Sequence, residues 1–218
     1  MQQTSIAVSK TAKICTLGKL TEQTKLTWMC LHGYGFLAQY FIKHFESINT
    51  GSNFILAPEA LNRFYLEGTR GRVGASWMTK EQRETDIEDI MNYLDAVYEP
   101  LTEKAKGNFV AFGFSQGTPA IFRWVVSRKI RVKAAVAWAS DIPADVLTPD
   151  GVAFLNATKV FVVIGNQDEF ISPERAQQAK DQLNFVGLDY ELISFEGKHR
   201  ILEEPLNKLY QSIHDQAG

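Results

Sequence analysis

Two kinds of apolar pattern alternate along this chain. Short and nearly continuous apolar runs, several of which end at glycine or proline, are typical of buried strands; they are LTWMCL, NFILAP, NFVAFGF, VKAAVAWAS, TKVFVVIG and residues 189–195. Longer stretches with apolar residues three or four positions apart predict helices. They cover residues 37–48, 83–104, the segment that follows NFVAFGF and runs to about Arg128, 173–186 and 201–214. Strands that alternate with helices predict an α/β fold with a doubly wound, mostly parallel sheet covered on both faces.

The start of the chain and one long connection depart from this alternation. The β-prone pieces SIAV and AKICTL precede the first buried strand and predict an antiparallel start to the sheet. Residues 59–80 show no clear periodicity, and connections of this length are uncommon unless they are functional. We therefore expect this excursion to form one wall of a site, within a single domain that spans residues 1–218.

Composition and charge count against several classes of function. The net charge of −2 gives no electrostatic reason to expect nucleic acid or an anionic membrane surface as a partner. The first residues lack the basic start and apolar stretch of a signal peptide, and no run of about 18 apolar residues could span a membrane. Cys15 and Cys30 are too few for a disulfide scaffold, and no Cys/His cluster has zinc-like spacing. We expect a cytoplasmic protein with reduced thiols and no metal site.

The pentapeptide GFSQG (113–117) is the first candidate for chemistry. A serine between two glycines can occur by chance, but this one lies between a buried strand and a helix. In such a tight turn, Gly113 and Gly117 remove the Cβ atoms that would clash, so Ser115 can be held in a strained conformation with its Oγ exposed. The following helix N-terminus favours an oxyanion nearby. Ser115 is therefore the candidate nucleophile.

A nucleophilic serine needs a base, and the base needs a group that orients it. In this architecture both follow later strands, in the order Ser, Asp/Glu, His. Asp168 follows the strand TKVFVVIG, and His199 follows the strand at 189–195. Glu169 is the alternative to Asp168. His32 is an alternative base, but it precedes a glycine turn early in the chain, so we expect it to be structural.

An oxyanion hole needs two backbone donors. One is the N–H after the nucleophile, which belongs to Gln116. The other comes from the loop after an early strand, and the glycines of LHGYG (31–35) let the backbone there approach a substrate, with Tyr34 N–H as the predicted donor.

The motifs LHGYG, GFSQG, GNQDEFIS and GKHR, in that order, resemble the phospholipase/carboxylesterase family of α/β-hydrolases, which includes acyl-protein thioesterases. The resemblance covers about residue 26 to the end. It implies the α/β-hydrolase fold, an esterase-type serine hydrolase without metal or organic cofactor, a triad of Ser115, Asp168 and His199, and oxyanion donors at Tyr34 and Gln116. The chain departs from the family at Thr118, where a second glycine is usual, and in a longer and more basic segment after residue 60.

The expected activity is hydrolysis of carboxylic esters with small or medium acyl chains through an acyl-enzyme, on a small-molecule substrate without stable membrane association. Acyl thioesterase or lysophospholipase activity is the alternative, and a non-catalytic binding module is less favoured. Five residues are candidates for substrate binding, namely Phe64, Tyr65, Arg72, Trp77 and Phe170. The alternatives are that the aromatic residues of the excursion pack it down and that its arginines are solvated.

Overall fold

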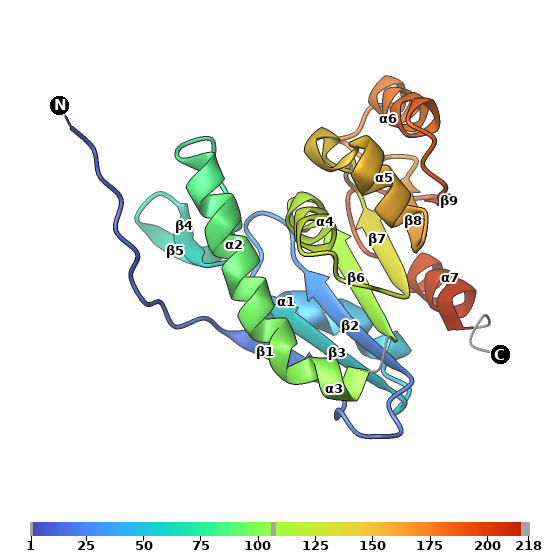
Figure 1. Ribbon diagram of the computed structural model, residues 1–218, viewed down its shortest axis with the longest axis horizontal. Helices are drawn as coiled ribbons and strands as arrows, with labels where there is room; N and C mark the ends of the chain where they lie inside the picture. The colour runs from blue at the N-terminus through green and yellow to red at the C-terminus, as the bar shows by residue number, and fades with distance from the viewer. Residues whose placement is uncertain (1, 106–107, 215–218) are drawn as a thin grey trace.

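The fold is built on one seven-stranded sheet (Figure 1), and the computed structural model describes residues 2–105 and 108–214. The strand order is β1-β3-β2-β6-β7-β8-β9, and only β1 runs antiparallel to its neighbour. The strands are β1 (Ile14–Leu17), β2 (Leu26–Leu31), β3 (Asn53–Pro58), β6 (Phe109–Phe114), β7 (Ala134–Trp138), β8 (Lys159–Gly165) and β9 (Glu191–Phe195). The predicted mostly parallel, doubly wound sheet with an antiparallel start is confirmed.

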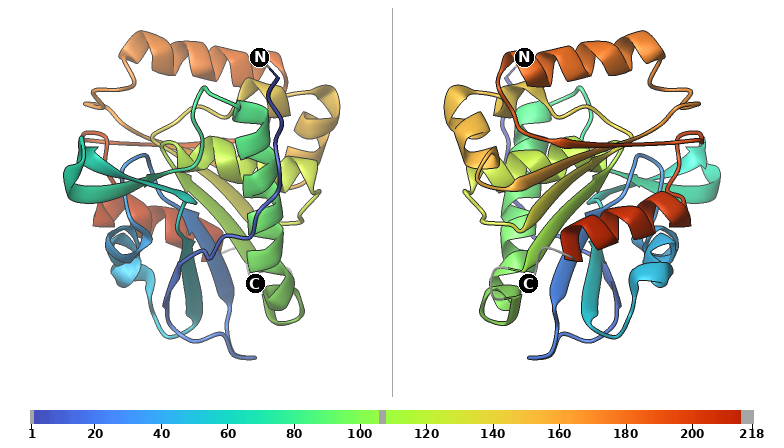
Figure 2. Two further views of the ribbon diagram at one scale, coloured as in Figure 1. Left: turned by 90° about the vertical axis from the view of Figure 1, so that its left-hand side faces the viewer. Right: turned by 90° about the vertical axis from the view of Figure 1, so that its right-hand side faces the viewer.

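Helices cover both faces of this sheet (Figure 2). One face carries α2 (Arg83–Tyr98), α4 (Gly117–Ser127), α5 (Pro149–Leu155) and α6 (Pro173–Phe185). The other face carries α1 (Ala38–Phe41), the 3-10 helix η1 (Ile42–Ile48) and α7 (Glu203–His214). Three further short helical elements are η2 (Glu99–Leu101), α3 (Thr102–Ala105) and η3 (Ala144–Val146).

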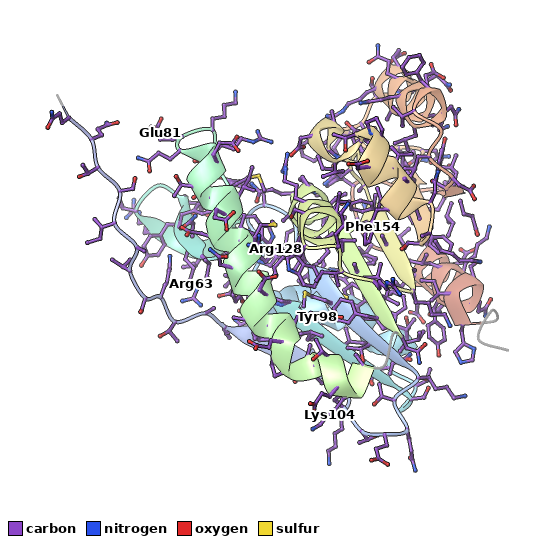
Figure 3. All side chains as sticks on the ribbon, in the orientation of Figure 1. Arg63, Glu81, Tyr98, Lys104, Arg128 and Phe154 are labelled. Atoms are coloured by element: carbon purple, nitrogen blue, oxygen red, sulfur yellow. The ribbon has the colours of Figure 1, made fainter. Side chains whose placement is uncertain are left out.

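The central strands are apolar throughout because helices pack on both sides of them. Every residue of β2, β6 and β7 is buried. Two apolar clusters result, one on each face, with Trp124 in the first and Trp138 in the second. Tyr98 and Arg128 lie between α2 and α4 (Figure 3), where Tyr98 packs edge-on against Trp124 and Arg128 pairs with Asp95. Burial of these surfaces is the main source of the fold's stability.

Three elements differ from the sequence predictions. The piece SIAV (5–8) forms no strand, and its apolar side chains Ile6 and Val8 are 80% and 78% exposed. The 59–80 excursion contains a hairpin of β4 (Asn62–Glu67) and β5 (Arg70–Ser76), which forms a separate two-stranded sheet (Figure 1). The short helix α5 was not predicted, and Thr148 caps its N-terminus by accepting a hydrogen bond from Gly151 N–H.

The parallel strands bring distant parts of the chain to one edge of the sheet. β2, β6, β7, β8 and β9 are parallel neighbours in that order, so their carboxyl ends lie at the same edge. The loops after these strands carry the residues that the sequence singled out. In open α/β sheets, ligands bind at this edge.

Candidate active site

Ser115 sits on a sharp turn between β6 and α4. Its φ of 50° lies in the left-handed region, which is unfavourable for a residue with a side chain. A Cβ on Gly113 would lie 2.4 Å from Thr118 Cα, and one on Gly117 would lie 2.2 Å from Leu31 O. Only glycine therefore fits on either side of the serine, and the turn can be as tight as the motif predicts.

Two hydrogen bonds hold this turn in place. Ser115 N–H donates to Trp138 O on the neighbouring strand β7, at 2.8 Å. The Thr118 hydroxyl, which is buried, donates to Gly113 O at 2.8 Å. Threonine at this position thus packs within the first turn of α4 and bonds back to the strand.

Asp168 and His199 meet at the ends of β8 and β9. His199 Nδ1–H donates to Asp168 Oδ2 at 2.8 Å, while Asp168 Oδ1 accepts N–H groups of Phe170 at 2.9 Å and Ile171 at 3.2 Å. Asp168 is 7% exposed, so these bonds replace the water that its carboxylate loses. Because Nδ1 carries the proton, His199 Nε2 is left as the acceptor, which is the tautomer a general base requires.

Glu169 contacts the backbone of His199 and not its ring. Its Oε2 accepts His199 N–H at 3.2 Å. Backbone N–H groups of Glu169 itself and of His199 lower the pKa of this exposed carboxyl. Of the two adjacent acids, Asp168 is therefore the one that contacts the imidazole.

Aromatic side chains flank the imidazole. The ring of Phe114 lies 5.1 Å from the ring of His199, and Phe170 packs edge-on against it at 4.7 Å. Phe170 is 65% exposed, so it covers part of His199 and still offers an apolar surface to a substrate.

The loop of residues 32–36, called the glycine loop here, carries the predicted donor Tyr34. Gly35 N–H donates to Ala75 O at 2.9 Å, and Ala75 N–H donates to Phe36 O at 3.1 Å, which fastens the loop to β5. Gln116 is the N-cap residue of α4, at the positive end of the helix dipole. The Tyr34 ring packs against Phe64 at 5.0 Å.

His32 is a buried structural residue of this loop. Its Nδ1–H donates to Gly33 O at 2.8 Å, and its Nε2 accepts Ala60 N–H at 3.0 Å. Both ring nitrogens are thus occupied within the protein, which agrees with the structural role expected from the sequence. Burial lowers the pKa of His32, so the folded protein keeps the imidazole neutral.

This lowered pKa makes stability depend on pH. As the pH falls below about 6.5, His32 takes up a proton in the unfolded chain before it does so in the folded protein. We therefore expect the free energy of unfolding to decrease between pH 7 and pH 5, by up to about 1.4 kcal/mol per pH unit for one such group. Chemical denaturation at several pH values measures this slope.

His44 has a pKa lowered by burial as well and contributes a slope of the same sign. The His32→Gln variant separates the two residues, because it removes only the contribution of His32. We expect a less stable protein with a flatter pH profile than wild type. A parallel profile, shifted but not flattened, would contradict this assignment.

A buried carboxylate anchors the start of α1. Glu59 is 2% exposed, and its Oε2 accepts Ala38 N–H at 3.1 Å. Its Oε1 accepts from Arg63 Nε at 2.7 Å. Arg63, labelled in Figure 3, is therefore held in an ion pair with Glu59. The side chains of Arg70 and Arg72 on β5 make no hydrogen bond or ion pair with the part of the chain that the structure describes.

A groove of about 790 Å³ lies between the glycine loop and the hairpin. Its walls are mainly apolar, and its lining residues are Tyr34, Gly35, Phe36, Leu37, Tyr40, Leu66, Arg72 and Val73. Of the five candidates for substrate binding, only Arg72 lines this groove. Trp77 is 1% exposed and lies in the core, Phe170 flanks His199, and Phe64 and Tyr65 lie on β4.

Sequence reasoning missed most of the groove. Leu37 and Tyr40 looked like the packing face of the helix predicted at 37–48, and Phe36 lay just before it. Leu66 and Val73 lay in a segment without periodicity. The signal that could have found Phe36, Leu37 and Tyr40 is the apolar stretch FLAQYF directly after LHGYG.

A comparison with models of protein families identifies the family of this chain. The model described as Phospholipase/Carboxylesterase matches residues 21–216. The chain belongs to the phospholipase/carboxylesterase family. Membership of this family supports an enzyme of the carboxylesterase-like hydrolase type. Among curated proteins, none matches this sequence.

Solved structures show the same fold for this phospholipase/carboxylesterase family member. Esterase PE8 shares 20% identity, with a TM-score of 0.70 and coverage of 95% of this chain and 99% of that chain. Acyl-protein thioesterase 2 of Zea mays shares 15% identity, with a TM-score of 0.72 and coverage of 96% and 100%. The Bacillus cereus carboxylesterase shares 13% identity, with a TM-score of 0.64 and coverage of 95% of each chain.

Two further features of the described residues concern metal ions and membranes. Within residues 2–105 and 108–214, no group of three or more His, Cys, Asp or Glu side chains is arranged to hold a metal ion. Among the same residues, none of the helices combines the length and the apolar character needed to cross a membrane.

Proposed function

We propose that this protein is a serine carboxylesterase that cleaves small-molecule esters through an acyl-enzyme. The observation that carries the proposal is the pairing of His199 with Asp168 at the same sheet edge as the strained Ser115. Such a set supplies a nucleophile, a base and a group that orients the base. Family membership supports the same class of reaction.

The first half-reaction forms an ester between the substrate acyl group and Ser115. His199 Nε2 takes the proton of Ser115 Oγ as the oxygen attacks the carbonyl carbon. Collapse of the tetrahedral intermediate breaks the bond to the alcohol oxygen, which leaves with the proton from His199. Asp168 keeps Nδ1 protonated and stabilises the imidazolium that forms in between.

The second half-reaction returns the enzyme to its starting state. His199 takes a proton from water, whose oxygen attacks the acyl-enzyme carbonyl, and Ser115 Oγ leaves with that proton. In both half-reactions the carbonyl oxygen becomes negatively charged. We assign the N–H groups of Tyr34 and Gln116 as its hydrogen-bond donors, and each is worth about 10²–10³ in kcat in comparable enzymes.

The groove supports an apolar acyl chain as the substrate. Its lining includes Tyr34, the residue whose N–H we assign to the carbonyl oxygen, together with the apolar side chains of Phe36 and Leu66. An acyl chain that lies there is removed from water, which stabilises its binding by about 0.8 kcal/mol for each CH₂ group buried. We therefore propose that medium-length acyl chains are preferred to acetate.

The series of p-nitrophenyl esters from acetate to laurate tests this function. We expect kcat/KM to rise from acetate toward octanoate as the chain fills the groove. In the Leu66→Asp variant, a charge replaces an apolar wall, so octanoate hydrolysis should fall about 10-fold while acetate hydrolysis changes less than about two-fold.

The matched control is Tyr65→Asp, because Tyr65 lies on the same strand, is half exposed and does not line the groove. We expect it to leave the chain-length profile unchanged. Equal effects of the two variants would remove the groove from the substrate site. No hydrolysis of any ester by wild type would reject the proposed function itself.

A further inference from the structure

The segment that leaves the hairpin, residues 75–78, links the two proposed oxyanion donors and is called the brace segment here. On one side it holds Gln116. Gln116 Nε2 donates to Met78 O at 2.9 Å, and its Oε1 accepts Trp77 N–H at 3.0 Å. The Ser76 hydroxyl lies 3.1 Å from Gln116 Nε2. The whole polar end of this side chain is therefore bound to the brace segment.

On the other side the brace segment holds the glycine loop on either flank of Tyr34. Trp77 Nε1–H donates to His32 O at 2.8 Å, two residues before Tyr34. Ala75 O accepts Gly35 N–H at 2.9 Å, one residue after it. Tyr34 is thus flanked by two bonds to the same short segment, one from the Trp77 indole and one to the Ala75 backbone carbonyl.

Packing makes the Trp77 contact rigid. Its indole is 1% exposed, and its ring lies 5.3 Å from the ring of His32 and stacks with Tyr93 at 6.5 Å. His32 in turn is fixed by bonds from both ring nitrogens. A side chain held from several directions can fix the position of the backbone it bonds to, because a close-packed core has low compressibility.

We propose that Trp77 and the side chain of Gln116 are positioning residues that set the spacing of the two oxyanion donors. The proposal rests on the serine esterase function above. Neither side chain contacts the reacting atoms in this assignment, since Trp77 is buried and Gln116 supplies its backbone N–H to the oxyanion. Preorganised donors act on the transition state and little on the bound ester, so displacing them lowers kcat and spares KM.

The Trp77→Phe variant tests the proposal because phenylalanine keeps an aromatic ring and loses only the indole N–H and part of the volume. We expect kcat for p-nitrophenyl butyrate to fall about 10- to 100-fold, with KM changed less than about two-fold. A trifluoromethyl ketone forms a tetrahedral adduct with a nucleophilic serine and places its oxyanion in the hole. Its inhibition constant should rise in parallel with the loss in kcat.

Trp124→Phe is the matched control. Trp124 is fully buried, and its Nε1–H donates to Asp95 Oδ1 at 2.8 Å, far along the chain from the glycine loop. The same chemical change there should lower the melting temperature and leave kcat and the inhibition constant within about two-fold. If Trp77→Phe behaves like Trp124→Phe in kinetics, Trp77 is only a packing residue and the proposal fails.

Gln116→Glu provides a second, nearly isosteric test that does not disturb the core. Glutamate cannot donate to Met78 O, so this bond to the brace segment is lost, while an oxygen remains that can accept Trp77 N–H. We expect the same pattern of lower kcat with preserved KM, whereas unchanged kcat would contradict the role of this side chain. A wild-type protein that hydrolyses no ester would overturn the proposed function, while active wild type with unaffected variants would overturn only the positioning role.

Discussion

Replacement of Ser115 by alanine is expected to lower ester hydrolysis by about 10⁴-fold or more, to near background. The physical reason is that no other nucleophile replaces Oγ at the turn between β6 and α4. The variant should stay folded, because alanine is no larger than serine and the backbone bond from residue 115 to Trp138 O is retained. Steady-state kinetics with p-nitrophenyl butyrate and a thermal melt measure the two quantities.

Ser127→Ala is the control for this variant, since Ser127 is the last residue of the helix that follows the Ser115 turn, and its hydroxyl donates to Arg123 O at 2.6 Å. It should keep wild-type activity. A serine-reactive fluorophosphonate should label wild type and Ser127→Ala but leave Ser115→Ala unlabelled. Retained turnover in Ser115→Ala would remove this residue from the mechanism.

The second large effect is expected at Asp168. In Asp168→Asn the side chain can donate to Nδ1, which favours the imidazole tautomer with its proton on Nε2, so His199 can no longer accept from Ser115. A drop in kcat of about 10⁴-fold is the usual result of such a change. Kinetics at a fixed pH with protein of verified fold provide the measurement.

Glu169→Gln is the matched variant on the adjacent residue. Glutamine keeps an oxygen that can accept His199 N–H, so we expect kcat to fall less than about 10-fold. The ratio between the two variants identifies which carboxylate orients the base. Comparable losses, or a larger loss in Glu169→Gln, would show that the assignment of Asp168 is wrong.

The parts of this protein that the sequence could predict are those governed by local rules. Buried strands such as LTWMCL and NFVAFGF are apolar throughout because both of their faces are covered, and the structure has them as β2 and β6. The turn at Ser115 follows from steric limits on Gly113 and Gly117, which act within a few residues. The pairing of His199 with Asp168 followed from the order of the strands.

The parts that escaped prediction depend on contacts between distant segments. Most side chains of β4 and β5 are exposed, so the hairpin has no alternating apolar pattern to detect. The hairpin is attached to the glycine loop by the pairing of Phe36 with Ala75, which are 39 residues apart in the sequence. The groove lies between these two segments, and the bonds of Trp77 arise two residues after Ala75. Exposed Ile6 and Val8 show the opposite case, in which local β-propensity finds no partner strand.

The position of β9 has a consequence for how the site can fail. β9 is the last strand at one edge of the sheet and is only partly buried, whereas β6, which leads to Ser115, is buried at the centre. Native proteins open locally at free energies well below that of global unfolding, and segments with few buried apolar contacts open most easily. Detachment of β9 would carry His199 away from Asp168 while the serine turn stayed intact. The enzyme would then lose its base before its core, and the fraction of active molecules would follow the stability of one edge strand.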